Sequence, residues 1–353
     1  MRQATKVAAV VAAATLGLAA CGGSSAEPPA PGGTGAGSTG GAAGGGALKI
    51  GMAYDVGGRG DQSFNDSAAA GLDKAKSELG VDGKEAAATT GEPESAREER
   101  LQQLIDAGYS NIVAVGFAYA PAVKKVAAEN SDVKFALVDS TDAAGPNIEN
   151  VTFAEHEGSF LVGAAAALKT KTNVLGFVGG VETTLIKKFE AGFVAGAKAV
   201  NPSIQVKIKY LTQPPDFSGF ASVDKGKAAA EGMYQQQADV VYHAAGGSGG
   251  GVFQAAKAAG KLAIGVDSDQ ALTADAAVRD VILTSMVKKV DVGVYDFIKS
   301  VKDGTFKAGT KVFDLKAGGI DYSTTGGKVD DIKAKLDDYK SKIISGEIKV
   351  PSA

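Results

Sequence analysis

Cysteine, tryptophan and histidine are scarce in this sequence, and their scarcity excludes several kinds of site. The 353 residues include one cysteine, Cys21, so neither an intrachain disulfide nor a thiolate zinc site can form. Tryptophan is absent, and the two histidines, His156 and His243, lie far apart along the chain. A formal net charge of only −3 gives no reason to expect a nucleic-acid-binding surface. We therefore expect no metal, no cofactor and no nucleic-acid partner.

Long apolar runs are also rare, and the one at the N-terminus has a specific context. Residues 7–20 are apolar, follow a short basic region and are too few to span a bilayer comfortably. They fit the hydrophobic core of a secretory signal. The run ends Leu-Ala-Ala-Cys at 18–21, which resembles the lipobox of bacterial lipoproteins, in which the cysteine is lipidated. We expect residues 1–20 to be a signal peptide and Cys21 to carry a lipid.

Charged and large side chains are nearly missing from the next segment. Residues 22–47 consist almost entirely of Gly, Ala, Ser, Thr and Pro. Such a composition buries too little apolar surface to fold and is typical of a flexible tether. The sequence therefore predicts a lipid, a tether over 21–47 and then a folded region that works at the extracytoplasmic face of the cell membrane.

From residue 48 onward, short apolar runs alternate with segments of helical periodicity. The predicted strands are 48–55, 111–116, 133–139, 147–153, 173–178, 204–211, 239–243, 262–266, 281–286 and 310–315. The predicted helices are 67–79, 94–107, 120–129, 158–169, 182–200, 224–237, 251–259, 289–302 and 329–345. This alternation predicts an α/β protein with two doubly wound parallel sheets, one in each half of the chain.

Polar residues stand at the predicted ends of several strands. Asp55, Asp139 and Asp267 each end a strand, and Lys288 follows another. One such carboxylate alone could be a helix N-cap. Ligands of open α/β sheets lie beyond the carboxyl ends of the strands, so several carboxylates with a lysine predict a cleft for hydroxyl-rich ligands.

The glycine-rich run 246–251 imitates several motifs. It satisfies G-x-S-x-G around Ser248, but both histidines precede that serine, which excludes the hydrolase order of acid and histidine. It also lacks the features of a P-loop or a dinucleotide-binding loop. We expect its backbone, with Gly246 and Gly247, to approach a ligand at a helix N-terminus.

Three aromatic residues lie in polar loops where they have little core to join. Phe64 follows the first strand, and Phe217 and Phe220 precede a later helix. Each either packs over the next helix or stacks on a flat ligand. The nearby tripeptide Arg-Gly-Asp at 59–61 could suggest adhesion, but so short a motif arises by chance. We instead expect Asp61 to shape the first ligand-binding loop and to hold Phe64 in place.

Five stretches together resemble the basic membrane protein family, the lipoproteins similar to purine nucleoside receptor A. They are GDQSFND (60–66), EGSFLVGA (157–164), AAGGSG (244–249), GVDSDQ (265–270) and LTSMVKKVD (283–291). The resemblance implies an ABC-importer substrate-binding protein with the type I periplasmic-binding-protein fold. Its lobes would be 48–154 plus about 287–316, and 155–286 plus about 317–350, joined by a hinge.

The resemblance also implies residue roles in a nucleoside site, with purines favoured. Phe64 would stack on the base beside Asn65, and Phe220 would oppose it. Asp55 and Asp139 would contact the base edge, and Gly246, Gly247, Asp267 and Lys288 the ribose. The sequence departs from the family pattern at 217–224, so Phe217 is an alternative to Phe220.

The expected protein is a monomer that passes its nucleoside to an ABC permease and catalyses no reaction. Two alternatives use the same cleft. A ribose-like sugar could replace the nucleoside, since sugars also stack on aromatic rings. A nucleosidase would use the carboxylates for catalysis, but the sequence has no calcium-ligand cluster, no placed histidine and no activated nucleophile.

Overall fold

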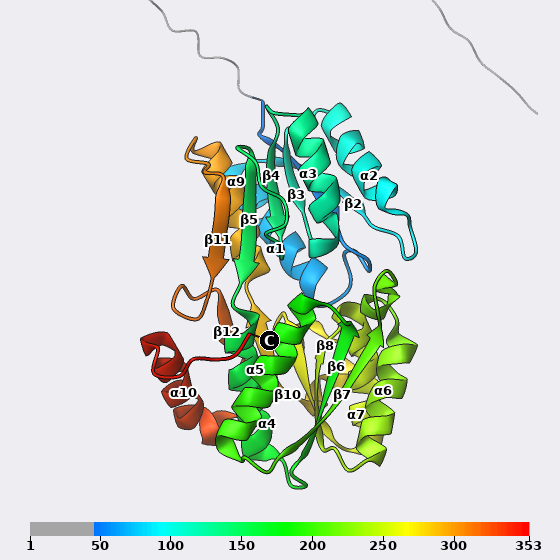
Figure 1. The fold of residues 1–353 in the computed structure, drawn as a ribbon, viewed down its shortest axis with the longest axis vertical. Coiled ribbons are helices and arrows are strands. Elements are labelled where there is room, and N and C mark those ends of the chain that lie inside the picture. The colour runs from blue at the N-terminus through cyan, green and yellow to red at the C-terminus, as the bar shows by residue number, and fades with distance from the viewer. Residues whose placement is uncertain (1–45, 353) are drawn as a thin grey trace, which may run out of the picture. The chain divides into compact units, whose positions relative to one another are not determined.

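The computed structural model describes residues 46–352 of the chain (Figure 1). The predicted signal peptide 1–20, the predicted lipidation site Cys21 and nearly all of the predicted tether lie outside these residues.

A first sheet is built mainly from the first third of the described chain. Within residues 46–352 it has six strands in the order β11–β5–β4–β3–β1–β2, each parallel to its neighbours (Figure 1). The strands are β1 (Lys49–Tyr54), β2 (Asp82–Ala87), β3 (Asn111–Ala114), β4 (Lys134–Val138), β5 (Ile148–Phe153) and β11 (Gly309–Phe313). The helices beside it are α1 (Phe64–Leu79), α2 (Glu94–Asp106), α3 (Ala120–Glu129) and α9 (Val290–Lys302).

The second sheet repeats this order with the following elements. Over the same described range its order is β12–β10–β9–β8–β6–β7, and only the β10–β12 pair is antiparallel. The strands are β6 (Val174–Val181), β7 (Gln205–Thr212), β8 (Val240–Ala244), β9 (Leu262–Asp267), β10 (Ile282–Lys288) and β12 (Ile320–Tyr322). Its helices are α4 (Glu155–Lys169), α5 (Thr184–Val200), α6 (Val223–Gln235), α7 (Gly249–Ala259), α8 (Gln270–Thr273) and α10 (Lys333–Ser345).

Helices cover both faces of each sheet because the strands are apolar on both faces. In β3, Ile112 packs with α2 and α3, whereas the next residue, Val113, packs with α1 and α9. In β8, Val241 packs with α6 and α7, whereas Tyr242 packs with α4 and α5. This alternation is the period of two expected of a strand. The predicted class, two doubly wound parallel sheets, is confirmed.

The chain passes between the two sheets three times. It leaves the first sheet between β5 and α4, returns between β10 and α9, and leaves again between β11 and β12. Glu155 begins α4 and Lys288 ends β10, so both residues lie at crossings. Any site between the sheets is therefore also close to the segments that connect them.

Every strand and helix predicted from the sequence is present in the structure, with its ends within a few residues of the predicted ones. Among the strands and α-helices of the described residues, three were not predicted, namely β2, β12 and the single turn α8. β2 has the polar sequence DGKEAA and lies at a sheet edge with no fully buried residue, so it has no apolar pattern. β12 has only three residues. Length and polarity explain why these strands were missed.

α4 and α5 lie against each other with backbone contact, and glycines make this possible. A Cβ atom at Gly196 would lie 1.9 Å from the carbonyl oxygen of Phe160, and one at Gly163 2.2 Å from that of Phe193. Any larger residue would force the helices apart. Their close approach fixes the position of α5, whose first turns carry Leu185, Ile186 and Phe189 to the edge of the sheet.

Gly196→Ala should therefore lower the free energy of unfolding, by about 1–3 kcal/mol or more, because the added methyl group overpacks the α4–α5 contact. Chemical denaturation of the full-length protein would measure the change. Gly232→Ala in α6 is the matched control, since a Cβ there has nothing within 4 Å. The control should be neutral or stabilising by about 0.5–1 kcal/mol. Equal effects of the two substitutions would contradict the packing role of Gly196.

Candidate ligand-binding site

A cavity lies between the carboxyl ends of the strands of both sheets. It encloses about 530 Å³ of space between protein atoms, part of it open to solvent. Eight of the nine residues predicted to bind ligand line it, namely Asp55, Phe64, Asn65, Asp139, Phe220, Gly246, Asp267 and Lys288. Gly247 does not line the cavity and stays a prediction.

The loop before α1 is organised by Asp61, which is buried. Its Oδ1 accepts hydrogen bonds from the backbone N–H groups of Ser63 and Asp66, and its Oδ2 accepts from the backbone and the side-chain amide of Asn65. These bonds satisfy free donors at the start of α1. They also orient Asn65, whose Oδ1 accepts from the backbone N–H of Asp55 at 3.1 Å. The prediction that Asp61 shapes this loop is confirmed.

The tripeptide at 59–61 is not displayed for adhesion. The Arg59 guanidinium lies 2.8 Å from a carboxylate oxygen of Asp73 and 2.9 Å from one of Glu85. Asp61 is directed into the loop and forms the bonds described above. An adhesion motif needs both charges free, and here both are used within the molecule.

Asp139 and Asp267 occupy equivalent positions in the two sheets, directly after β4 and at the end of β9. Both have left-handed backbone conformations, with φ of 68° and 64°. This conformation is uncommon for residues other than glycine and costs free energy. Strain retained at the same place in both halves, beside one cavity, points to a role for the two carboxylates.

Lys288 is a buried cation held by carboxylates. It forms an ion pair with Asp139, and its Nζ lies 3.5 Å from Oε1 of Glu155. Nζ also lies 5.0 Å from the ring centroid of Phe64 and 5.5 Å from that of Phe189. Burial lowers the pKa of Lys288, but the negative charges of the surrounding carboxylates outweigh burial and hold the pKa above its ordinary value. Lys288 therefore stays charged.

Two buried carboxylate oxygens of this cluster have no hydrogen-bond partner within residues 46–352: Oδ1 of Asp139 and Oε2 of Glu155. An unpaired buried acceptor costs free energy, and a donor supplied by a ligand would remove that cost. Asp139 lines the cavity, so a ligand bound there lies beside this residue.

Burial raises the pKa of both Asp55 and Asp267 to about 6. The N–H of Val56 and the charge of Arg97 oppose this rise at Asp55, and Lys288 and Ser63 oppose it at Asp267. At neutral pH both groups are mostly ionised, so each presents an acceptor to the cavity.

Side-chain hydrogen bonds connect the loop before α1 to the second sheet. The Ser63 hydroxyl donates to Oδ2 of Asp267 at 2.8 Å, and the Ser268 hydroxyl donates to the Ser63 carbonyl at 3.0 Å. The Gln270 amide donates to the Gln62 carbonyl, also at 3.0 Å. The loop before α1 and Asp267 are thus held together across the two sheets. Sequence reasoning missed these contacts because they join residues about 200 positions apart.

The aromatic residues separate into two environments. Phe64, Phe117, Phe189 and Phe220 line the cavity, whereas Phe217 lines an outer groove with Pro215, which Phe117 borders as well. The ring of Phe220 lies against Gly180, where a Cβ would come within 2.4 Å of it. Phe117 meets Phe217 edge-on at a centroid separation of 5.8 Å. Of the two alternatives, Phe220 is the ring that faces the cavity.

Two glycines of the run, Gly249 and Gly251, serve the packing of α7. Gly246 lines the cavity, as predicted. A Cβ at Gly249, however, would lie 1.9 Å from the His243 ring, and one at Gly251 would lie 1.9 Å from the Val223 carbonyl oxygen. The run therefore lets α7 approach both β8 and α6. The expectation that the whole run approaches a ligand was too broad.

Several residues at or near the cavity were not predicted as part of the site. Leu185, Ile186 and Phe189 line it from α5, and Phe117 lines it from the turn before α3. The spacing of Leu185 and Phe189 indicated an apolar helix face, but could not show that this face ends at a ligand cavity. Arg97 and Glu155, which lie beside the predicted carboxylates, carried no signal at all.

Among the described residues, no histidine, cysteine, serine or threonine lines the cavity. His243 is fully buried, and its Nε2 lies 3.0 Å from Oε1 of Gln270. Burial lowers the pKa of His243 to about 4, so it is neutral. Over residues 46–352, no three His, Cys, Asp or Glu side chains gather in a way that could hold a metal ion.

Two parallel-sheet lobes that enclose a polar and aromatic cavity define a bilobal solute-binding protein with the periplasmic-binding-protein fold. The family model of PnrA-like ABC transporter substrate-binding proteins matches residues 48–353. The chain belongs to this family, the one that the sequence motifs indicated. It is therefore an ABC transporter substrate-binding protein. No helix among the described residues is long and apolar enough to cross a membrane.

Similar proteins agree with this assignment. The CD4+ T-cell-stimulating antigen of Listeria monocytogenes is 39% identical over 320 residues, covering 86% of this chain and 87% of that protein. The ABC transporter nucleoside-binding protein BmpA of Lactococcus lactis is 37% identical over 321 residues, covering 86% and 89%. A crystal structure of an ABC transporter solute-binding protein from Aeropyrum pernix has a TM-score of 0.75 at 30% identity, covering 87% and 94%.

The buried position of Glu155 predicts a pH dependence of stability. Burial raises the pKa of Glu155 to about 7, so the folded chain binds this proton more tightly than the unfolded chain does. The wild type therefore loses stability from this group as pH rises from about 4 to about 7. Glu155→Gln does not titrate. The free energy of unfolding of Glu155→Gln minus that of the wild type should therefore rise from pH 5 to pH 8, by an amount on the order of 1–3 kcal/mol.

Denaturant unfolding without ligand at both pH values measures this difference. Glu99→Gln, at an exposed position on α2, is the matched control and should show no change with pH. A constant or falling difference for Glu155→Gln would show that Glu155 does not titrate as described.

Proposed function

We propose that this substrate-binding protein captures a nucleoside, with purines favoured, between its two lobes and delivers it to an ABC import permease. Cys21 carries a lipid that holds the protein at the extracytoplasmic face of the cell membrane, and the tether 21–47 lets the folded region reach the permease. The protein works as a monomer and catalyses no reaction on its ligand.

The observation that carries the proposal is the composition of the cavity wall. One cavity combines aromatic rings with carboxylates and a buried lysine. Rings can stack on a flat base, and carboxylates accept hydrogen bonds from ring N–H groups and from vicinal hydroxyls. A nucleoside can use all of these contacts at once, because it has a flat base, ring N–H groups and vicinal hydroxyls. The printed name of the Lactococcus relative, a nucleoside-binding protein, supports the same ligand class.

Each wall of the cavity receives a part of the ligand. Phe64 and Phe220 stack on the base, with Asn65 beside Phe64. Asp55 and Asp139 contact the base edge, where their acceptors face ring N–H groups. The ribose lies against the backbone of Gly246 and Gly247 and the side chains of Asp267 and Lys288. Asp139, assigned to the base edge, and Lys288, assigned to the ribose, form an ion pair. The two parts of the proposed site are therefore adjacent, as the two parts of a nucleoside are.

Ligand capture is a change in the arrangement of two lobes about a hinge. The lobes are 48–154 plus about 287–316, and 155–286 plus about 317–350. The three crossings of the chain between the sheets support these boundaries. Because the cavity wall comes from both lobes, a ligand makes its full set of contacts only when they are close together. It therefore stabilises that arrangement by its differential affinity.

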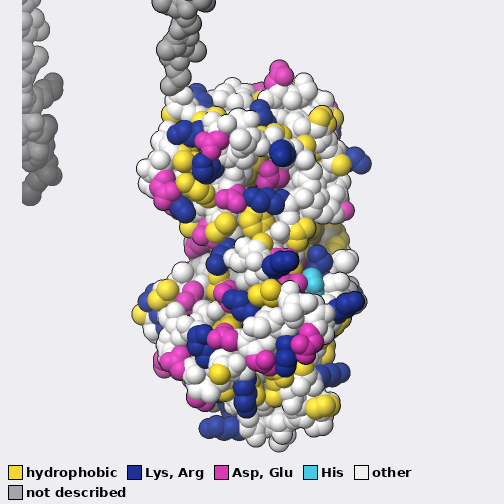
Figure 2. All heavy atoms as spheres, turned by 90° about the vertical axis from the view of Figure 1, so that its left-hand side faces the viewer, with side chains coloured by type: hydrophobic (Ala, Val, Ile, Leu, Met, Phe, Trp, Pro, Cys, Tyr) yellow, Lys and Arg dark blue, Asp and Glu magenta, His cyan; other side chains and the backbone are white. Residues whose placement is uncertain are grey.

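The face of the molecule shown in Figure 2 gives no support to a polyanionic ligand. Figure 2 shows basic and acidic side chains interspersed over one face of the molecule, with no broad area of one sign. With a formal net charge of −3, long-range attraction of nucleic acid is weak. A small neutral ligand fits this surface better.

A thermal-shift panel on the full-length protein in mild detergent tests the ligand class. Nucleosides should raise the melting temperature because they bind the folded state only. Free bases, pentoses and nucleotides should raise it less, and nucleotides least, since an added phosphate would meet the carboxylate of Asp267. Stabilisation by ribose and by no nucleoside would replace this proposal with a sugar receptor. Release of free base from a bound nucleoside would indicate a nucleosidase instead.

Substitution of the aromatic residues tests the stacking roles. Phe64→Ala and Phe220→Ala should each weaken nucleoside binding by roughly tenfold to a hundredfold, as removal of a ring that stacks on a base costs about 1–3 kcal/mol. Isothermal titration calorimetry measures the affinities.

Phe217→Ala is the matched control, since Phe217 lies in the same loop but lines the outer groove. It should change the affinity much less. A larger loss for Phe217→Ala than for Phe220→Ala would reverse the assignment of the stacking ring.

A further inference from the structure

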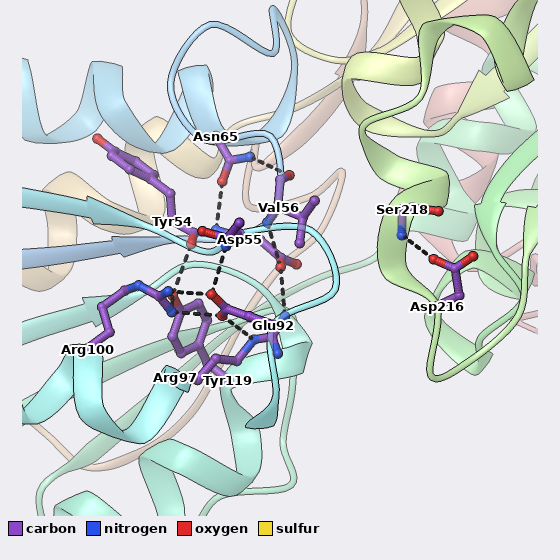
Figure 3. A network of polar contacts seen from close by, with 11 residues as sticks. Tyr54, Asp55, Val56, Asn65, Glu92, Arg97, Arg100, Tyr119, Asp216 and Ser218 are labelled. Atoms are coloured by element: carbon purple, nitrogen blue, oxygen red, sulfur yellow. Dashed lines mark hydrogen bonds and ion pairs between the residues drawn. The ribbon is translucent and has the colours of Figure 1, made fainter. Parts of the chain in front are cut away.

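The charged residue nearest to Asp55 is Arg97, which lies on α2 and which no feature of the sequence singled out. Arg97 is 4% exposed. One guanidinium nitrogen lies 3.8 Å from Oδ1 of Asp55, and its Nε lies 3.9 Å from Oε1 of Glu92 (Figure 3). The Nε has no hydrogen-bond partner within residues 46–352. Arg97 is therefore a buried cation at ion-pair distance from two carboxylates, and its guanidinium also lies 5.7 Å from the ring centroid of Tyr119 and 5.6 Å from that of Phe217.

A second arginine, Arg100, pairs with Glu92, which leaves Asp55 as the main partner of Arg97. Arg100 donates two hydrogen bonds to the Glu92 carboxylate, at 2.5 and 2.9 Å (Figure 3). Arg100 also donates to the Tyr119 hydroxyl, which in turn donates to the Tyr54 carbonyl. Bidentate pairing with Arg100 offsets most of the charge of Glu92. Arg97 then has Asp55 as its less compensated partner.

The Asp55 carboxylate has one occupied oxygen and one free oxygen. Oδ1 accepts from the Val56 N–H at 2.8 Å and faces Arg97. Oδ2 receives no hydrogen bond from any of residues 46–352. It lies beside Gly116, where a Cβ would come within 2.6 Å of it. Asp55 lines the cavity, so its free oxygen is available to a ligand.

The groups that face Asp55 set its charge together. From α2 and the loop before it these are Arg97, Glu92 and, behind Glu92, Arg100. From the end of β4 it is Asp139, which Lys288 neutralises, and from the turn before α3 it is Tyr119. Burial raises the pKa of Asp55; the hydrogen bond from the Val56 N–H and the charge of Arg97 lower it, and Glu92 and Asp139 raise it. Arg97 is the side chain that forms an ion pair with Asp55 and so favours its ionised form.

We propose that Arg97 is a specificity-determining positioning residue, which holds Asp55 as an anionic acceptor and so makes the site prefer 6-oxopurine nucleosides over adenosine. This inference rests on the proposed function, in which Asp55 contacts the base edge. Guanine and hypoxanthine carry an N1–H, which donates to an ionised carboxylate. Adenine has an unprotonated N1, which accepts, beside an N6 amino group, which donates. A carboxylate that faces N1 therefore pairs with adenine there only when it is protonated and donates.

The preference is consequently linked to pH. Guanosine and adenosine share the same ribose, so effects of Asp267 and Glu155 on ribose binding cancel in the ratio of the two affinities. The protonation state of Asp55, which faces the base, still changes the ratio of the two affinities. Above the pKa of Asp55, adenosine binding requires that Asp55 take up a proton from solvent. The affinity for adenosine therefore falls up to tenfold for each pH unit. Below that pKa, guanosine loses its acceptor.

Calorimetric titration of the full-length protein with guanosine and adenosine between pH 5 and pH 8 tests the proposal. Buffers of different ionisation enthalpy report the protons taken up. In the wild type, guanosine should bind at least about tenfold more tightly than adenosine at pH 8, and the ratio should approach one at pH 5. Adenosine binding at pH 8 should take up close to one proton, and guanosine binding close to none.

Arg97→Met should move the midpoint of the affinity ratio to higher pH. At pH 7.5 it should weaken guanosine binding about tenfold without weakening adenosine binding. Glu92→Gln removes a charge that raises the pKa of Asp55 and should move the midpoint the other way. Arg97→Lys keeps the charge and should retain the wild-type preference. Lys125→Met is the control, because it removes one exposed cation from α3, paired with Glu98, and should change nothing.

Melting temperatures without ligand show whether each variant folds. If Arg97→Met does not fold, the two single variants Arg97→Lys and Glu92→Gln still test the proposal. Two outcomes would overturn the role of Arg97 and leave the proposed function standing. One is an equal loss of affinity for both nucleosides in Arg97→Met, and the other is a wild-type ratio of the two affinities that does not change with pH. A wild type that binds no nucleoside would overturn the proposed function as well, so the two failures are distinguishable.

Discussion

The ion cluster around Lys288 is the interaction on which the arrangement of this molecule depends. A buried ammonium group is tolerated only when carboxylates and hydrogen bonds compensate its lost hydration. Here the carboxylates come from separate parts of the chain: Asp139 from the end of β4 and Glu155 from the start of α4. Lys288 itself ends a strand of the other sheet. The charges can be neutralised only if both sheets and the crossings between them are in place.

The same cluster leaves part of the site unsatisfied without a ligand. Asp139 keeps one buried oxygen without a partner and a left-handed backbone, and Asp267 has the same conformation in the other sheet. These features cost free energy in the folded chain, and a ligand that donates to the carboxylates recovers part of it. The stability of the protein and its affinity for ligand are therefore coupled through the same side chains.

The sequence predicted the residues at strand ends well, because parallel strands bring their carboxyl ends to one edge. Asp55, Asp139, Asp267 and Lys288 could be selected by this rule alone. Arg97 could not, because it stands in SAREER (95–100), where its charge resembles those of exposed neighbours. Phe217 and Phe220 are three residues apart in one loop. Only the space above Gly180, a contact across 40 positions, distinguishes them.

The two halves of the molecule have the same strand order but contribute different chemistry. β4 and β9 are equivalent, and both place a strained aspartate at the cavity. β1 and β6 are also equivalent, yet only β1 is followed by a cavity carboxylate, Asp55, whereas Glu182 after β6 forms an ion pair with Lys187. The buried arginine beside Asp55 has no counterpart among the ion pairs of the second sheet in residues 46–352. The asymmetry gives the cavity a direction, so a ligand with two unlike ends has one preferred orientation. Recognition of such a ligand then requires both lobes at once, and neither half contains the site alone.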